Sequence, residues 1–188
     1  MGVSLNHMVL EGKAGVTGRK PSWLKMKMPG GSEYLKIVHG LIRGAPPHLD
    51  LDRERVLIAL LSRAAAAGLL QSAHDCSDGG LAVTLAECAF DTNGIGLDVT
   101  VTDASGNPPA TLFGESASRA VVSVAAPNVS ALLKIAAELG VPALRIGRTG
   151  GSRIVINVSG GSGIDCSVAE AERIWSNALG QYFAGQAA

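Results

Sequence analysis

The sequence predicts an α+β fold, a two-layer domain in which helices cover one face of a mainly antiparallel sheet. Apolar residues recur at helical spacing in some segments and at every second position in others. These segments follow one another without the strict βαβ alternation of a parallel sheet. Hydrophobic residues make up 47% of the 188 residues, so the chain can bury a real core.

Two helices are expected first. Residues 32–43 carry apolar side chains at helical spacing, and the sequence Gly44-Ala-Pro-Pro47 stops this helix. Asp50 or Asp52 can cap the next helix, which ends at Gly68. The broad apolar face of this second helix predicts burial against the sheet.

In the middle of the chain, apolar residues recur in turn at strand spacing and at helical spacing. Residues 69–73 are expected to form a short buried strand that leads through a polar turn into a helix at 81–90. From residue 95 to 101 apolar and polar residues alternate, which predicts a half-buried strand. Residues 103–109 are expected to be a surface turn.

The last third contains both kinds of element. Strands are predicted at 120–124, 143–146 and 153–158, and a helix at 129–139. The glycine-rich segment from Gly147 to Gly151 is expected to join the last two strands as a hairpin. Ser167 heads a final helix through about Phe183, with Glu170 completing a capping-box pattern.

Composition argues against several classes of partner. Sixteen basic and sixteen acidic residues balance, so no overall field favours nucleic acid or an acidic membrane. No apolar run approaches the roughly 20 residues that a membrane helix needs. Cys76, Cys88 and Cys166 are far apart and include no Cys-x-x-Cys pair, which favours the reducing cytoplasm over a disulfide framework or a zinc site.

Residues 1–29 are predicted to be a flexible N-terminal segment, because they hold several Gly and Lys residues and show little periodicity. The domain itself is expected to span residues 30–188.

The polar turn that begins at Asp75 is the main candidate site. Asp75, Ser77 and Asp78 offer hard oxygen donors, and Gly79 and Gly80 let a ligand approach the backbone at the start of a helix. This combination suits a phosphate with its Mg²⁺. The alternative is an ordinary loop in which Ser77 or Asp78 caps the helix.

Four strings together resemble the last domain of the formylglycinamidine ribonucleotide synthase family, an AIR-synthase-like C-terminal domain. Their order and spacing match that family as well. The strings are Gly30-Gly-Ser-Glu-Tyr-Leu35, Pro47-His-Leu-Asp-Leu51, His74-Asp-Cys-Ser-Asp-Gly-Gly-Leu81 and Leu112-Phe-Gly-Glu-Ser-Ala-Ser-Arg119.

The resemblance implies ATP or ADP and Mg²⁺ as cofactors. In that family the position of Asp75 ligates Mg²⁺, and Ser77, with Gly79 and Gly80, matches positions at the nucleotide phosphates. Glu115 and Ser116 match a segment expected to contact substrate or phosphate. Within this segment Ala117 replaces a Gln of the family, which puts a polar contact there in doubt, and Arg119 is expected to pair with a carboxylate such as Glu115.

The implied activity is the ATP-dependent conversion of formylglycinamide ribonucleotide to its amidine with glutamine-derived ammonia. No catalytic residue is expected in this chain, since the family's catalytic histidine lies in an upstream region that it lacks. His74 is therefore expected to be structural. The chain looks like a truncated piece of the synthase and is expected to be inactive alone.

The implied partners are AIR-synthase-like N-terminal domains, a glutaminase subunit and a small bridging subunit. An exposed apolar inter-domain face would favour a homodimer. Two alternatives remain open: a non-catalytic nucleotide-binding or assembly module, and the final domain of another enzyme of the same superfamily.

Overall fold

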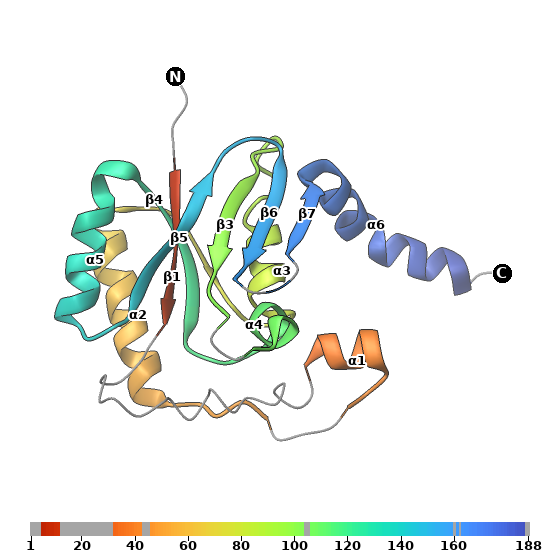
Figure 1. The fold of residues 1–188 in the computed structure, drawn as a ribbon, viewed down its shortest axis with the longest axis horizontal. Coiled ribbons are helices and arrows are strands. Elements are labelled where there is room, and N and C mark those ends of the chain that lie inside the picture. The colour runs from red at the N-terminus through yellow and green to blue at the C-terminus, as the bar shows by residue number, and fades with distance from the viewer. Residues whose placement is uncertain are drawn as a thin grey trace.

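The computed structural model describes residues 5–11, 32–42, 46–103, 106–159, 161 and 163–186 (Figure 1). The strands are β1 (Leu5–Glu11), β2 (Leu70–Asp75), β3 (Leu97–Val101), β4 (Arg119–Ala125), β5 (Ala143–Thr149), β6 (Arg153–Val158) and β7 (Ile164–Ser167). The helices are α1 (Glu33–His39), α2 (Leu51–Ala66), α3 (Gly80–Glu87), α4 (Pro108–Phe113), the short 3-10 helix η2 (Ala126–Asn128), α5 (Val129–Glu138) and α6 (Val168–Gln186).

In the described part of the chain, the seven strands form one sheet in the order β2-β4-β1-β5-β3-β6-β7. Neighbouring strands run antiparallel except β3 and β6, which are parallel. The predicted α+β class with a mainly antiparallel sheet is therefore confirmed. Asp50 caps α2, as predicted, by accepting hydrogen bonds from the N–H groups of Asp52 and Arg53.

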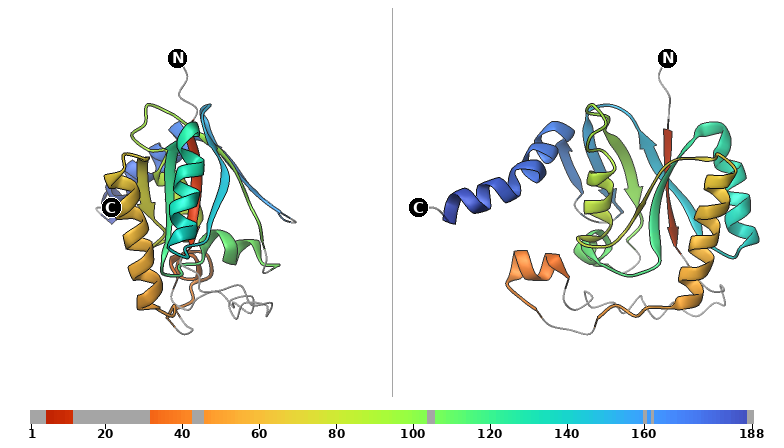
Figure 2. Two further views of the ribbon diagram at one scale, coloured as in Figure 1. Left: turned by 90° about the vertical axis from the view of Figure 1, so that its left-hand side faces the viewer. Right: turned by 180° about the vertical axis from the view of Figure 1, so that it is seen from behind.

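Two apolar clusters hold the helices to the sheet. One joins α2 and α5 to β4 through residues such as Leu60, Leu132 and Val122, and these two helices lie side by side at one end of the sheet (Figure 2). The other joins α3 to β3, β6 and β7 and includes Val121 of β4. Since Val121 and Val122 belong to different clusters, helices cover both faces of β4 rather than one.

The N-terminal segment differs from the sequence prediction. Residues 5–11, expected to be flexible, form β1, which pairs antiparallel with both β4 and β5 in the interior of the sheet. Both partner strands lie more than a hundred residues away along the chain, so no local sequence pattern predicts this strand. The remaining parts of the predicted segment, 1–4 and 12–29, lie outside the described residues.

The predicted hairpin between the last two long strands is wrong. β5 and β6 do not pair, because β3 lies between them and pairs with both. Close approach of these backbones requires glycine at two positions. A Cβ at Gly96 would lie 2.1 Å from the carbonyl oxygen of Arg153, and one at Gly147 would lie 2.1 Å from that of Asp98.

β2 is also less buried than predicted. It is one of the two edge strands of the described sheet, and Gln71, Ser72 and Ala73 are exposed. Within the described sheet β2 pairs only with β4, so the hydrogen-bonding groups on its other edge have no strand beside them. Two short elements were missed altogether: α4, which starts at the expected surface turn, and β7, which pairs with β6.

Candidate functional site

The candidate turn joins the end of β2 to the start of α3. The N–H of Cys76 donates to the carbonyl oxygen of Arg119 at 3.0 Å, which extends the β2–β4 ladder by one bond. The Thr84 hydroxyl donates to the carbonyl oxygens of both Asp75 and Gly80 at 3.0 Å. The backbone of Asp75 is therefore fixed, whereas 74% of its side chain is exposed.

The two glycines of the turn are required by its backbone. Gly79 and Gly80 have φ of 76° and 66°, in the left-handed region that favours glycine. A Cβ on Gly80 would lie 2.8 Å from the carbonyl oxygen of Gly114. Gly79 is the N-cap of α3 and no side chain caps it, so the alternative in which Ser77 or Asp78 caps the helix is not realised. Both of those side chains are exposed.

Glu115 connects the turn to α1. One carboxylate oxygen, Oε1, accepts hydrogen bonds from the N–H of Gly79 at 2.9 Å and from the N–H of Glu33 at 2.8 Å. Free N–H groups at helix starts attract anions, and here a side chain of the protein supplies the negative charge. Tyr34 of α1 also stacks on Phe113, with ring centroids 4.7 Å apart. Three of the four family-like strings thus meet at one point.

The Arg119 side chain holds the backbone on both sides of Glu115. The Arg119 guanidinium donates to the carbonyl oxygens of Gly114 and Ser116. Among the described contacts, the guanidinium therefore binds backbone carbonyls. It does not pair with the Glu115 carboxylate, contrary to the prediction from the sequence. Ser118 has φ of 62°, and its hydroxyl donates to Glu54 at 2.7 Å. Ser116 is half-buried beside Glu115.

His74 contacts groups on two elements of the fold. Its Nδ1 lies 2.8 Å from the carbonyl oxygen of Asp75, and its Nε2 lies 3.5 Å from a carboxylate oxygen of Glu87. The ring thus connects the end of β2 to the end of α3. Sequence reasoning missed Thr84 and Glu87 as supports of the turn, although their positions one and two helical turns beyond Gly80 could have indicated it.

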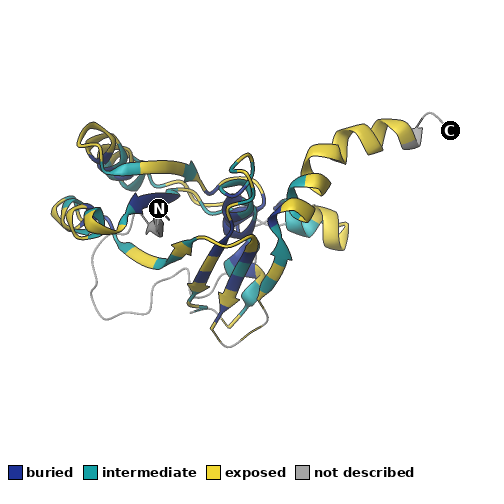
Figure 3. Cartoon of the chain, turned by 90° about the horizontal axis from the view of Figure 1, so that it is seen from above, coloured by how far each residue is buried: buried dark blue, intermediate teal, exposed yellow. Residues whose placement is uncertain are grey.

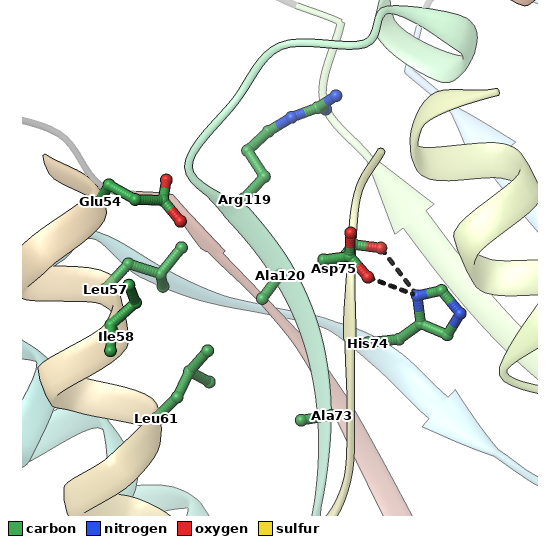
Figure 4. A pocket seen from close by; sticks show the side chains of 9 residues that line it. All are labelled: Glu54, Leu57, Ile58, Leu61, Ala73, His74, Asp75, Arg119 and Ala120. Atoms are coloured by element: carbon green, nitrogen blue, oxygen red, sulfur yellow. Dashed lines mark hydrogen bonds and ion pairs between the residues drawn. The ribbon is translucent and has the colours of Figure 1, made fainter. Parts of the chain in front are cut away.

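A pocket of about 320 Å³ lies between α2 and the strands β2 and β4 (Figure 4). Its wall is largely apolar, and His74, Asp75, Glu54 and Arg119 contribute polar groups. Figure 4 shows Asp75 and His74 paired on the strand across from α2. The lining residues are Glu54, Leu57, Ile58, Leu61, Ala73, His74, Asp75, Arg119 and Ala120.

Metal-binding groups are sparse at this site. In the part of the chain that the structure describes, no group of three or more His, Cys, Asp or Glu side chains is placed to hold a metal ion. The turn thus offers the exposed carboxylates of Asp75 and Asp78, but no such group of three. Mg²⁺ often accepts one or two carboxylates and completes its shell with phosphate oxygens and water, so the donor set suits Mg²⁺ only as part of a nucleotide complex.

The family described as "AIR synthase related protein, C-terminal domain" matches residues 24–174. The chain belongs to this family. It is 43% identical over 150 residues to "Phosphoribosylformylglycinamidine synthase subunit PurL" of Moorella thermoacetica, and 46% identical over 127 residues to the protein of the same name from Thermobifida fusca. These alignments cover 80% and 68% of the chain but 20% and 16% of the relatives. The chain therefore spans about a fifth of the length of the curated relatives that it matches.

Solved structures show the same AIR-synthase-type fold. "T. maritima PurL complexed with FGAR" superposes with a TM-score of 0.69 at 16% identity, over 89% of this chain and 28% of that one. "T. maritima PurL complexed with ATP" gives a TM-score of 0.62 at 16% identity, over 89% of this chain and 25% of that one. No helix within the described residues is long and apolar enough to cross a membrane.

Proposed function

We propose that this chain supplies the C-terminal AIR-synthase-type domain of a phosphoribosylformylglycinamidine synthase. The 43% identity over 150 residues to a synthase subunit carries this proposal. The reaction phosphorylates the amide oxygen of the substrate with ATP, and ammonia then displaces phosphate to give the amidine, ADP and phosphate. Because the chain spans a fifth of its relatives' length, we expect it to be inactive alone.

The domain would contribute a nucleotide-binding turn. Asp75 would hold Mg²⁺ through its exposed carboxylate, and Ser77, Gly79 and Gly80 would face the phosphates. In support, Asp75 is exposed while Thr84 fixes its backbone, so the carboxylate can reach a cation, in competition with its 3.5 Å contact to His74 Nδ1. The Mg²⁺ ion, when bound, would neutralise phosphate charge. Solved relatives are titled as complexes with ATP and with ADP.

Glu115 would set the approach of the phosphates. Its carboxylate accepts the Gly79 N–H, the donor that a phosphate at this helix start would use. A phosphate must therefore displace Glu115 or bind beside it, with Ser116 as the next polar side chain.

The partners would be those of the complete synthase. AIR-synthase-like N-terminal domains would complete the nucleotide site, and a glutaminase subunit with a small bridging subunit would supply ammonia, in the cytoplasm. One solved relative is titled "Structure of PurLQS from Thermotoga maritima", which supports a multi-subunit assembly.

A domain exchange tests the synthase role. The aligned 150-residue segment of the Moorella relative is replaced with that of this chain, and amidine formation is measured with ATP, ammonia and substrate. We expect the chimera to retain activity and the chain alone to have none. A folded chimera without activity, or synthase activity in the chain alone, would contradict the proposal.

The second candidate is a non-catalytic nucleotide-binding or assembly module. Its assembly form is favoured by the carboxylate of Glu115, which already occupies the Gly79 N–H that a phosphate would use. Titration of Mg²⁺ and ADP into the purified chain by calorimetry, with Asp75→Asn as the control, separates binding from catalysis. Nucleotide binding by the chain, combined with an inactive chimera, would favour the module.

A further inference from the structure

The last helix, α6, leaves the body of the protein. Its first turns are anchored: Val168 is fully buried, the N–H of Asp91 donates to Glu172 at 3.0 Å, and the Trp175 ring lies 5.3 Å from that of Phe90. Beyond this point the helix projects away from the sheet (Figure 1). Seen from above, nearly all of the projecting part is exposed (Figure 3).

The projecting part carries large apolar side chains on one side. Trp175 and Leu179 are four residues apart, and Leu179 lies three and four residues before Tyr182 and Phe183, so these four lie on one side of the helix, with Ile174 at its edge. On the opposite face, Arg173, Asn177 and Gln181 are polar. The apolar stripe, with exposed fractions, consists of Ile174 at 57%, Trp175 at 53%, Leu179 at 73%, Tyr182 at 61% and Phe183 at 65%.

Such a stripe is not expected to remain in water. Helices in proteins owe most of their stability to packing of their apolar face. In this stripe Trp175 contacts Phe90 at the base of the projecting part, yet all five side chains are more than half exposed. Its five side chains expose roughly 600 Å². Two such stripes in contact would bury on the order of 1,200 Å², the lower range for a specific protein interface.

We propose that the stripe on α6 is a two-fold interface with α6 of a second copy of this chain. Charge argues for a second copy, since residues 174–186 contain no charged side chain and therefore neither repel a second copy nor match a charged partner. The family match ends at residue 174, so most of the stripe lies outside the part that matches the family.

The two helices run antiparallel. A parallel pair would bring Glu172 against its own equivalent, whereas antiparallel pairing sends the charged first turns to opposite ends of the interface. A two-fold axis near Leu179 places Trp175 of one copy beside Phe183 of the other, because both are four residues from the centre. Aromatic contacts of this kind stabilise interfaces strongly. This pairing is independent of the proposed synthase role.

Sedimentation velocity of the full chain across a concentration series tests the interface. We expect a reversible monomer–dimer equilibrium. Leu179→Arg should weaken dimerisation roughly a hundredfold, because both copies lose a buried leucine and gain a charge. Since Leu179 is 73% exposed in the single chain, its replacement should leave the circular dichroism of the body unchanged.

Asn177→Arg is the matched control, on the opposite face of the same helix, and should dimerise like the wild type. Cross-linking adds a geometric readout: Leu179→Cys should form an intermolecular disulfide under mild oxidation, and Asn177→Cys should not. A monomer at all concentrations, or a dimer that Leu179→Arg leaves intact, would overturn the proposal.

Discussion

β4 and β2 are neighbours in one sheet, yet they differ completely in burial. In β4 every side chain from Ala120 to Val124 is at most 3% exposed, because helices pack on both faces. β2 has a single neighbouring strand, a mostly exposed surface, and Asp75 at its end. Pairing with β4 holds the backbone of β2 in place, while the Asp75 side chain at its end is 74% exposed, so a stable sheet presents a carboxylate to solvent.

Replacing Val122 with Asp should have the largest effect. The side chain is fully buried between the sheet and α2 and α5, so an unpaired carboxylate there should destabilise the protein by about 4 kcal/mol or more. Gln71→Asp, on exposed β2, is the matched control and should cost less than about 0.5 kcal/mol. Urea unfolding followed by circular dichroism measures both. Equal losses of unfolding free energy in the two variants would contradict the difference in burial between β4 and β2.

Glu115→Ala should have an intermediate effect. It leaves the N–H groups of Gly79 and Glu33 without their acceptor, which should cost about 2 kcal/mol. Glu115→Gln keeps an oxygen acceptor and should cost less. The same unfolding assay applies, and an alanine variant as stable as the wild type would show that this carboxylate does not hold α1 to α3.

Asp75→Asn should change stability by less than about 0.5 kcal/mol, since most of this side chain is in solvent. The same variant should lose binding of Mg²⁺ with ADP in calorimetry. A large loss of stability would mean that the β2 carboxylate serves the fold rather than a ligand.

Cys88 should give an effect that is visible only at high pH. Burial, with smaller contributions from Cys76 and Glu87, raises the pKa of its thiol from 9.0 to about 11. The unfolded chain then ionises first, so stability should fall as the pH rises from about 9 to about 11. Cys88→Ala should show a shallower decline than the wild type in pH-dependent urea unfolding. Parallel curves for the two proteins would refute this assignment.

The candidate site was only partly predictable. The spacing of Asp75, Gly79 and Gly80 was sufficient to predict a turn before a helix, and the structure has one. That Glu115, 36 positions beyond Gly79, would accept its N–H could not be read from local pattern. The exposure of β2 was missed for a similar reason, since an apolar run cannot reveal whether its strand lies at the edge of a sheet.

Most of the helices and strands, and the left-handed turn at Gly79, follow from periodicity, capping and backbone conformation within a few residues of sequence. The place of β1 between β4 and β5, the place of β3 between β5 and β6 and the exposure of the α6 stripe follow from the tertiary structure alone. Strand order and burial depend on which distant segments meet, and the free energy of such contacts appears in no local pattern.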